Sequence, residues 1–308
     1  MLKLVTIGTV AIVASAANPD HHPISQKTID AIKAAKTTWT PLEESENPLA
    51  QFSHATLNRD RLGTIVRGSQ AGYPEAPVAN GFPTDFDSRD VWPGKIHPIR
   101  DQAQCGSCWA FGATEALSDR FAIASNGATD VILSAQDLVS CDSDNYGCQG
   151  GYLSNAWNYL ASTGAVSDES FPYTSGTGNV EQCPAVLGHK YKCQAGTVQQ
   201  YSSVDAIKTA VQADGPVETQ FSVYGDFYNY KGGVYQHVTG GLEGGHAVKI
   251  IGWGHDEASG LDYWHIANSW GEGWGETGFF KIKQGDCGVD SNAYACQADL
   301  SSAGAWTQ

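Results

Sequence analysis

Two cysteines stand three residues apart in the stretch QCGSCW, residues 104–109, and the second begins the run CWAFGATEALSDRFAI. In that run Trp109, Ala113, Ala116 and Phe121 fall near one face, which predicts a helix that starts at the second cysteine. Cysteines with this spacing occur as redox-active dithiols, as halves of zinc sites, and as a structural cysteine beside a catalytic one. Each possibility requires a different surrounding fold.

The neighbouring sequence argues against the first two possibilities. A thioredoxin-type dithiol should follow a clean β-strand in a domain of about 100 residues, whereas prolines and polar residues precede this pair in WPGKIHPIRDQAQ, residues 92–104. A zinc site should have a second matched pair of ligands, and SCDSDNYGC, residues 140–148, has the wrong spacing for a zinc finger. The third possibility is therefore favoured.

The first residues predict a secreted protein. Residues 1–17 contain Lys3, an apolar run and the small residues ASAA, which is the layout of a signal peptide. No later stretch approaches the roughly 18 apolar residues of a membrane span. We expect the chain to enter the secretory pathway, and to act in a lysosome- or vacuole-like compartment or outside the cell. In such oxidising surroundings its eight cysteines can pair.

Composition indicates a globular and acidic protein. With 308 residues, of which 41% are hydrophobic, the chain can bury a core in one or two domains. Residues 82–308 hold 11 Lys and Arg against 26 Asp and Glu, and so carry the whole excess of negative charge. Because this surface repels phosphates and anionic lipids, we expect neither a nucleic acid nor a membrane as a partner.

The chain changes character twice. Residues 18–81 contain a possible short helix within SQKTIDAIKAAKTTW and end in a Pro-, Gly- and Asn-rich tract that resembles a linker. From residue 82 the pattern is helix-rich over about 95–190 and strand-rich over about 191–300, where HAVKIIGWG, DYWHIANSW and GFFKIK are separated by glycines. This order predicts an α+β fold in which the later part is an antiparallel sheet or barrel.

Cys108 is the candidate nucleophile. A nucleophilic thiol needs a lowered pKa, and a helix N-terminus supplies about half a positive charge. Ser107 directly before it could cap the helix, and Cys105, one turn earlier, would be the structural cysteine. His246, which follows a glycine pair at the start of a predicted strand, could be the base.

Two further side chains could complete the site. Asn268, at the end of the next predicted strand, is placed to orient the imidazole of His246. Gln102 could donate a hydrogen bond to an oxyanion, together with the backbone N–H of Cys108. Each residue alone is weak evidence, because a single histidine or glutamine is usually structural. The prediction rests on the set.

Four motifs, QAQCGSCWAF, SCDSDNYGCQGG, GGHAV and ANSWGEGWG, occur in the order seen in the papain family of cysteine proteases, which the chain resembles over about residues 82–298. FDSRDVWP and FSVYGDFYNYKGGVYQHVTG are most similar to the cathepsin B group. The resemblance implies a papain-like fold of two domains: a helical left domain and an antiparallel, barrel-like right domain, with the active cleft between them.

The implied function is that of a cysteine endopeptidase, made as an inactive zymogen, for general protein degradation in an acidic or extracellular compartment. Cys108 would attack as a thiolate paired with protonated His246 and form a thioester acyl-enzyme. Trp270 would shield the bond between His246 and Asn268 from water. Gly150 and Gly151 would pair with the substrate backbone by β-strand addition.

The sequence departs from cathepsin B in two places that bear on specificity. The occluding loop, whose paired histidines bind a substrate's C-terminal carboxylate, has no counterpart, since the matching region contains only His189. We therefore expect an open cleft and endopeptidase activity. Asn292 stands where cathepsin B has a glutamate in the pocket for the side chain two residues before the cut, so the preference for arginine there should weaken.

The cysteine count leaves an odd thiol. Seven cysteines remain after Cys108, so at least one more is free or bonded to another chain. The resemblance implies that Cys105 pairs with Cys148 and Cys141 with Cys183. The partners of the remaining three stay open, and Ser170 stands where cathepsin B has a cysteine. The undecided residues are Cys193, Cys287 and Cys296.

Residues 18–81 are predicted to be a propeptide that lies through the cleft against the substrate direction and blocks Cys108. The mature peptidase would then extend over residues 82–308, beginning near Phe82. We expect peptides and proteins as substrates, the propeptide and cystatin-like proteins as inhibitors, a monomer, and neither a metal nor a cofactor. Two other functions stay open: a dithiol oxidoreductase that uses Cys105 and Cys108, and a catalytically silent binding module.

Overall fold

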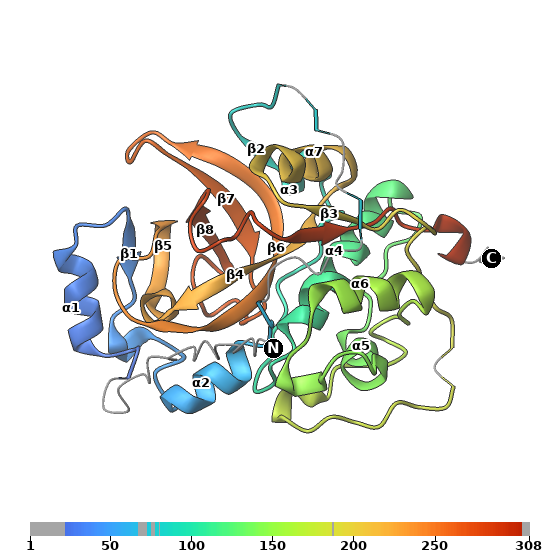
Figure 1. The fold of residues 1–308 in the computed structure, drawn as a ribbon, viewed down its shortest axis with the longest axis horizontal. Helices are drawn as coiled ribbons and strands as arrows, with labels where there is room; N and C mark the ends of the chain where they lie inside the picture. Colours follow the sequence, from blue (N-terminus) through green and yellow to red (C-terminus); the bar gives the residue numbers. More distant parts are fainter. Residues whose placement is uncertain (1–21, 67–72, 75–77, 80, 187, 304–308) are drawn as a thin grey trace, which may run out of the picture.

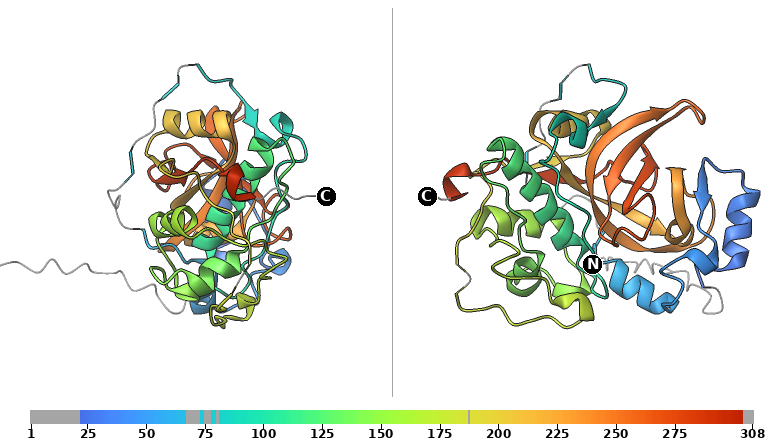
Figure 2. Two further views of the ribbon diagram at one scale, coloured as in Figure 1. Left: turned by 90° about the vertical axis from the view of Figure 1, so that its right-hand side faces the viewer. Right: turned by 180° about the vertical axis from the view of Figure 1, so that it is seen from behind.

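The computed structural model describes residues 22–66, 73–74, 78–79, 81–186 and 188–303, so the predicted signal peptide lies outside the described residues. A helical half and a curved sheet stand side by side, and the segment that ends at residue 66 lies against both (Figure 1). Figure 2 shows the same arrangement from behind, with the helices on one side and the sheet on the other.

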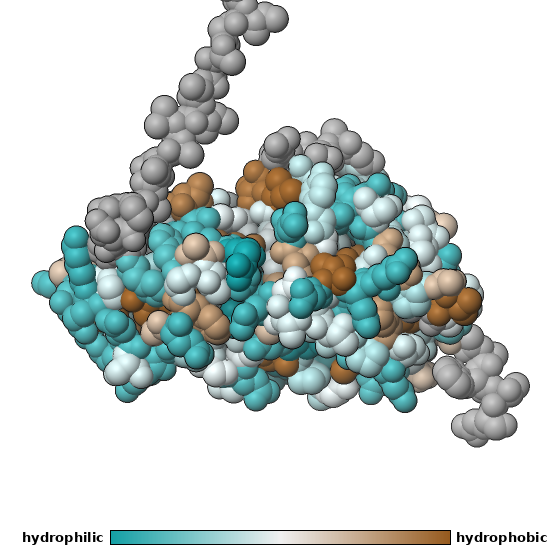
Figure 3. Space-filling model, turned by 90° about the horizontal axis from the view of Figure 1, so that it is seen from below, coloured by the Kyte–Doolittle hydropathy of each residue, from teal (hydrophilic) through white to brown (hydrophobic). Residues whose placement is uncertain are grey.

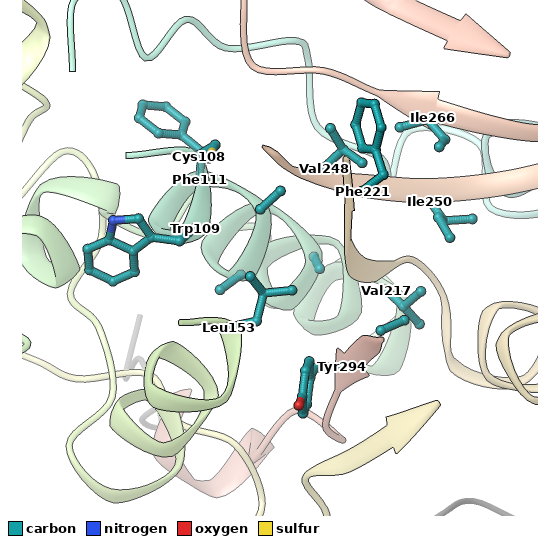
Figure 4. Close-up of a cluster of buried hydrophobic side chains, with 14 of the residues drawn as sticks. Cys108, Trp109, Phe111, Leu153, Val217, Phe221, Val248, Ile250, Ile266 and Tyr294 are labelled. Atoms are coloured by element: carbon teal, nitrogen blue, oxygen red, sulfur yellow. The ribbon is translucent and has the colours of Figure 1, made fainter. Parts of the chain in front are cut away.

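One long helix lies at the centre of the helical half. The helices of this half are α4 (Cys108–Ala124), α5 (Ala135–Cys141) and α6 (Leu153–Ser162), with 3-10 turns η2 (Gly147–Gln149) and η3 (Ser175–Thr177). The short helix α3 (Ser88–Val91) packs against the sheet. α4 is buried on nearly all sides, because it packs against α5 and α6 on one side and against the sheet on the other. Figure 4 shows Trp109 directed toward the helical half, while Phe221 and Val248 lie on the strands at the other side of the helix.

The strand-rich half is one curved sheet. Its strands run in the order β1-β5-β8-β7-β6-β4-β9-β3, and β2 pairs with β6. The pairing is antiparallel except between β5 and β8, which are parallel. The strands are β1 (Trp39–Pro41), β2 (Phe86–Asp87), β3 (Gln199–Tyr201), β4 (Val217–Tyr224), β5 (Tyr230–Tyr235), β6 (Leu242–Asp256), β7 (Leu261–Ala267), β8 (Phe279–Lys283) and β9 (Ala293–Ala295).

Short helices complete this half. α7 (Val204–Asp214) begins at Ser203, whose side chain accepts from the backbone of Ala206. The 3-10 turns are η4 (Gly225–Asn229) and η5 (Leu300–Ala303). α7 was not predicted, although Ala206, Ile207, Ala210 and Val211 recur at helical spacing and form its buried face.

The leading segment is folded and belongs to the structure of the whole chain. It contains α1 (Gln26–Ala34), the 3-10 turn η1 (Glu44–Glu46) and α2 (His54–Arg61), and its strand β1 joins the sheet by pairing with β5. Ser25 caps α1 and Ser53 caps α2, each by accepting from the backbone three residues on. In Figure 1 α1 and β1 lie at the outer edge of the sheet, and α2 lies below its inner edge, toward the helical half.

Three disulfides stabilise the chain. Cys105 is bonded to Cys148, Cys141 to Cys183, and Cys193 to Cys296. Cys108 and Cys287 are free thiols. The sequence left the partners of Cys193, Cys287 and Cys296 open, and the structure pairs Cys193 with Cys296 and leaves Cys287 free.

The described surface is mainly polar. Figure 3 shows hydrophilic residues over most of the face seen from below, with hydrophobic residues in small separate groups. The large hydrophobic residues that are exposed come from well-separated parts of the sequence, among them Val91, Tyr146 and Leu242. Among the helices that the structure describes, none has the length and apolar character needed to cross a membrane.

Buried carboxyl groups lie where α4 meets the sheet. Asp119 accepts from Lys249 at 2.7 Å, and burial raises the pKa of Glu115, 4.0 Å from the same lysine, to about 7. Glu218 on β4 accepts from Trp157 at 2.7 Å through Oε2, while no described residue bonds to its Oε1. Burial raises the pKa of Glu218 well above its ordinary value, so this carboxyl is neutral when folded.

We expect Glu218→Gln to change how stability depends on pH. A carboxyl whose pKa is raised by folding contributes its full stability below its unfolded pKa of about 4.3 and loses it as the pH rises. The melting temperature of the variant minus that of the parent should therefore increase by about 2 °C or more between pH 4.5 and pH 8. Thermal unfolding in a Cys108→Ala background measures this difference, with the exposed Glu257→Gln as control. Parallel curves for parent and Glu218→Gln would contradict the prediction.

Candidate active site

Cys108 is the first residue of α4 and is fully buried. Its Sγ lies 3.3 Å from Oγ1 of Thr64, a residue of the leading segment. The backbone of Ala247 also forms a hydrogen bond to the thiol. Burial is the largest influence on the thiol and raises its pKa, although these hydrogen bonds act in the opposite direction.

Ser107 occupies the N-cap position of α4 but does not cap the helix with its side chain. Its hydroxyl instead lies 2.9 Å from the hydroxyl of Tyr173 and donates to the carbonyl of Cys105. The expected side-chain cap is therefore wrong. Because the Ser107 side chain accepts no hydrogen bond from the first turn, the positive end of the helix dipole acts on Cys108.

His246 lies on β6, with its ring fully buried. Its Nε2 is 2.7 Å from Oδ1 of Asn268, which directly follows β7 and also accepts from the backbone of Ser269. No described residue forms a hydrogen bond to Nδ1, so one ring nitrogen is fixed and the other is left for a reactant. Burial lowers the pKa of His246 to about 4.

Trp270 covers this histidine. The two ring centroids are 4.8 Å apart and the planes are tilted by 33°. Trp270 is itself buried by Phe227 and stacks on Tyr228, which holds the indole in place. Its Nε1 donates to the backbone carbonyl of Arg61 at 3.3 Å.

The side chain of Gln102 is fixed by two hydrogen bonds, one to the helical half and one to the loop after β7. Its Oε1 accepts from the hydroxyl of Ser269 at 2.7 Å, and its Nε2 donates to the carbonyl of Cys105 at 3.0 Å. The same Nε2 also donates to the carbonyl of Asp60 at 3.0 Å. One of the two amide protons of Gln102 is therefore bound to a backbone carbonyl of the leading segment.

The leading segment crosses the site as an extended strand. The N–H of Gly151 donates to the carbonyl of Gly63 at 2.8 Å, and the N–H of Ile65 donates to the carbonyl of Gly151 at 3.0 Å. On the opposite side the N–H of Thr64 donates to the carbonyl of Gly245 at 3.1 Å. Thr64 thus pairs in parallel with Gly151 and antiparallel with Gly245.

Glycine is required on the helical side of this strand. A Cβ on Gly150 would lie 2.7 Å from the carbonyl oxygen of Gly63, and Gly150 has a φ of 107°, which favours glycine. A Cβ on Gly151 would lie 2.7 Å from the ring of Trp109. The disulfide between Cys105 and Cys148 ties this glycine edge to the loop before α4.

Asn292 lies in a different part of the molecule, next to Gln200. It is almost fully buried, and its Oδ1 accepts from Gln200 at 2.7 Å. The leading segment passes nearby, since the ring of Tyr73 packs edge-on against Tyr294 and the carbonyl of Pro74 accepts from the backbone of Gln200. No hydrogen bond joins the described side chain of Asn292 to Cys108 or His246.

The structure therefore brings Gln102, Cys108, His246, Asn268 and Trp270 together and places the glycine pair beside them. Sequence reasoning missed two contributors, Thr64 and Ser269. Thr64 acts through its position on the strand, which has no characteristic sequence. Ser269 lies inside the motif ANSW, and its position next to Asn268 was the signal that could have found it. Within the described residues there is no group of acidic, histidine or cysteine side chains suited to a metal ion.

Comparisons with known proteins agree with this geometry. The family described as papain family cysteine protease matches residues 82–297. Cathepsin B-like cysteine proteinase 6 of Caenorhabditis elegans is 39% identical, with 85% of this chain and 80% of the relative covered. Cathepsin B-like cysteine proteinase 5 of the same organism is 36% identical, with 97% of this chain and 99% of the relative covered.

Solved structures extend the similarity to the leading segment. Procathepsin B S9 from Trypanosoma congolense superposes with a TM-score of 0.82 at 27% identity, covering 91% of this chain and 100% of the other. Procathepsin L2 from Tenebrio molitor superposes with a TM-score of 0.72 at 27% identity, covering 88% of each chain. The predicted α+β, papain-like fold is confirmed. The chain belongs to the papain family of cysteine proteases, of the cathepsin B-like kind, and is made as a zymogen.

Proposed function

We propose that this cysteine protease is an endopeptidase in which Cys108 is the nucleophile and His246 the proton carrier. One observation carries the proposal: residues 63–65 lie across the thiol and use hydrogen-bonding groups that a substrate would need. Gly63 accepts from the backbone of Gly151, and the hydroxyl of Thr64 lies against the thiol. A peptide that replaces this strand would present a carbonyl to Cys108.

The reaction follows from the positions of these groups. The Cys108 thiolate attacks the carbonyl carbon, and the resulting oxyanion accepts from Gln102 Nε2 and the Cys108 N–H. His246 protonates the leaving amine through Nδ1, the C–N bond breaks, and a thioester remains. His246 then takes a proton from water, which attacks the thioester and releases the acid and the thiol. Asn268 holds Nε2 throughout, so the reactive nitrogen keeps its direction.

The zymogen holds these groups in an inactive form. The Gln102 amide is bonded to the carbonyl of Asp60, and the indole of Trp270 to that of Arg61. Burial beneath this segment raises the pKa of the Cys108 thiol and lowers that of His246 to about 4. A neutral thiol therefore faces a neutral imidazole, and removal of the segment would return water to both.

We propose that residues 18–81 are the propeptide, and that the mature peptidase begins near Phe82. The ring of Phe82 packs against Trp253 with 6.0 Å between centroids, which would anchor the new terminus. Polar contacts hold the propeptide against the protease half, among them Arg61 to Asp101 at 2.8 Å and Lys231 to Glu46 at 3.2 Å.

The proposed compartment is lysosome-like or extracellular, reached through the secretory pathway by way of a signal peptide at residues 1–17. Three disulfides support this proposal, because such bonds persist in oxidising compartments. Peptides and proteins are the proposed substrates, the propeptide and cystatin-like proteins the proposed inhibitors, and a monomer the proposed form.

An open cleft is proposed because the histidine of the region that would carry an occluding loop lies far from Cys108. His189, the histidine of that region, borders a pocket with Asp130 and Glu169, close to the C-terminal end of α4. Cys108 is at the other end of this helix of 17 residues, about 25 Å away. Asn292 is proposed to border the pocket for the side chain two residues before the cut, where its neutral amide offers arginine no charged partner.

We expect an irreversible epoxide trap to label Cys108 of the acid-activated protein and to abolish cleavage of a dipeptidyl fluorogenic amide in parallel. Mass spectrometry locates the adduct. Cys108→Ala should abolish cleavage, and Gln102→Ala should reduce kcat by about 100-fold, because one oxyanion donor is lost.

Cys287 is the internal control for the trap, because it is the other free thiol and burial beside Asp286 raises its pKa. Labelling at Cys287 with cleavage intact would refute the assignment of the nucleophile. A protein freed of residues 18–81 that neither reacts nor cleaves would instead favour the binding module.

We expect internal cleavage to dominate over release of C-terminal dipeptides. Among the described residues of the protease half, no two adjacent histidines are present to hold a terminal carboxylate, so amidating the C-terminus of a test peptide should change kcat/KM by less than about threefold. Product analysis by mass spectrometry, with paired free-acid and amide peptides, measures this ratio. Dipeptide release at a rate that matches internal cleavage would contradict the open cleft.

We expect Cys108 of the intact zymogen to resist alkylation between pH 5 and 7. Its thiol is neutral there, and removal of residues 18–81 should increase the rate with iodoacetamide by about 100-fold. Quenched time courses read by mass spectrometry give the rate, while Cys287 provides the internal standard and electrophoresis confirms that the zymogen is uncut. Equal rates before and after activation would show that the segment does not silence the thiol.

A further inference from the structure

Glu243 is an acidic side chain beside the proposed site that the mechanism does not use. It lies near the start of β6, three residues before His246, and its side chain is only 6% exposed. Its Oε2 accepts from Asn58 Nδ2 at 2.6 Å and pairs with His54 Nε2 at 2.5 Å. Both partners belong to α2 of the leading segment.

α2 presents one polar face to the protease. His54, Asn58 and Arg61 are spaced by four and three residues, so they lie on the same side of the helix. Arg61 forms an ion pair with Asp101 at 2.8 Å, and the backbone of Asp101 pairs with that of Trp270 in an isolated β-bridge. Two basic side chains of α2 therefore pair with two carboxylates of the protease half, Glu243 and Asp101.

The position of α2 relates Glu243 to the scissile bond. In the proposed function the acyl half of a substrate pairs with Gly151, so the leaving half extends to the other side of Cys108. Residues before Gly63 occupy that side, because Asp60 accepts from Gln102 and Leu62 lies over Gly244, where a Cβ would be 3.0 Å away. α2 thus fills the region of the leaving-group half.

Removal of the segment leaves Glu243 without the hydrogen-bond partners that the structure records. His54 and Asn58 would both be gone, and no described residue of the protease half forms an ion pair with this carboxylate. Tyr228, whose hydroxyl donates to Asn58, would lose its partner at the same place. The residues on both sides of Glu243, Leu242 and Gly244, pair with β4, and Glu243 lies at the irregularity between them.

We propose that Glu243 is a specificity-determining residue that binds a basic side chain on the leaving-group side of the scissile bond, with Asp101 adding negative charge nearby. The inference rests on the proposed function. His54 serves as the stand-in for this side chain in the zymogen, and the substrate class is that of peptides with lysine or arginine shortly after the cut.

The test compares cleavage of matched peptides that carry lysine or its uncharged analogue norleucine at each of the first three leaving-group positions. The ratio of kcat/KM within a pair isolates the charge from the hydrocarbon stem. We expect the activated parent to favour lysine by about fivefold to tenfold at one position. Glu243→Gln should reduce the ratio to within about twofold, and Glu243→Lys should invert it in favour of a glutamate peptide.

Glu257→Gln is the matched control, because Glu257 is exposed just beyond the opposite end of the same strand and should keep the parent ratio. Titration of the activated thiol with the epoxide shows that each variant is folded. A lysine preference that survives Glu243→Gln, or a parent without any preference, overturns the inference. A parent that cleaves none of the peptides instead refutes the proposed function, which makes the two failures distinguishable.

Discussion

The burial of α4 on both sides is the constraint on which the rest of the structure depends. A helix that packs against α5 and α6 and also against β4 and β6 cannot move without opening the core. Its first residue is therefore held where the two halves meet, and Cys108 faces residues from both. Because the thiol lies at the positive end of this helix, its position and its electrostatic surroundings have the same origin.

In the proposed function, the propeptide inhibits the zymogen by using the groups that would bind a substrate. Backbone pairing with Gly151 and Gly245 needs no particular side chains, so a segment of the same chain can occupy the site as a peptide would. The parallel pairing with Gly151 reverses the strand relative to an antiparallel substrate and directs Thr64, with its hydroxyl, at the thiol. Burial then disfavours both the thiolate and the imidazolium, which adds an electrostatic block to the steric one.

Sequence motifs predicted the groups that act through their own chemistry. Cys108, His246 and Asn268 stand out because thiol, imidazole and amide in that order have few structural explanations. In the fold His246 bonds to Asn268, and the backbone of Ala247, the next residue, bonds to the Cys108 thiol. Contacts that depend on chain geometry were not predictable. Three such contacts depend on how distant segments meet: the parallel pairing of β5 with β8, the disulfide between Cys193 and Cys296, and the contact of Thr64 with Cys108. The hydroxyl of Ser107 likewise bonds to Tyr173 and not to the helix backbone.

Charge explains why one surface can serve both inhibition and selection. Residues 1–81 have equal numbers of Lys and Arg and of Asp and Glu, whereas the rest of the chain is strongly acidic. His54 and Arg61 of α2 accordingly meet carboxylates of the protease half. A carboxylate such as Glu243 costs free energy to bury unless a donor satisfies it. α2 satisfies it in the zymogen, and after activation the same cost would favour a peptide that supplies a cation there, so the zymogen partner of Glu243 indicates what can replace it.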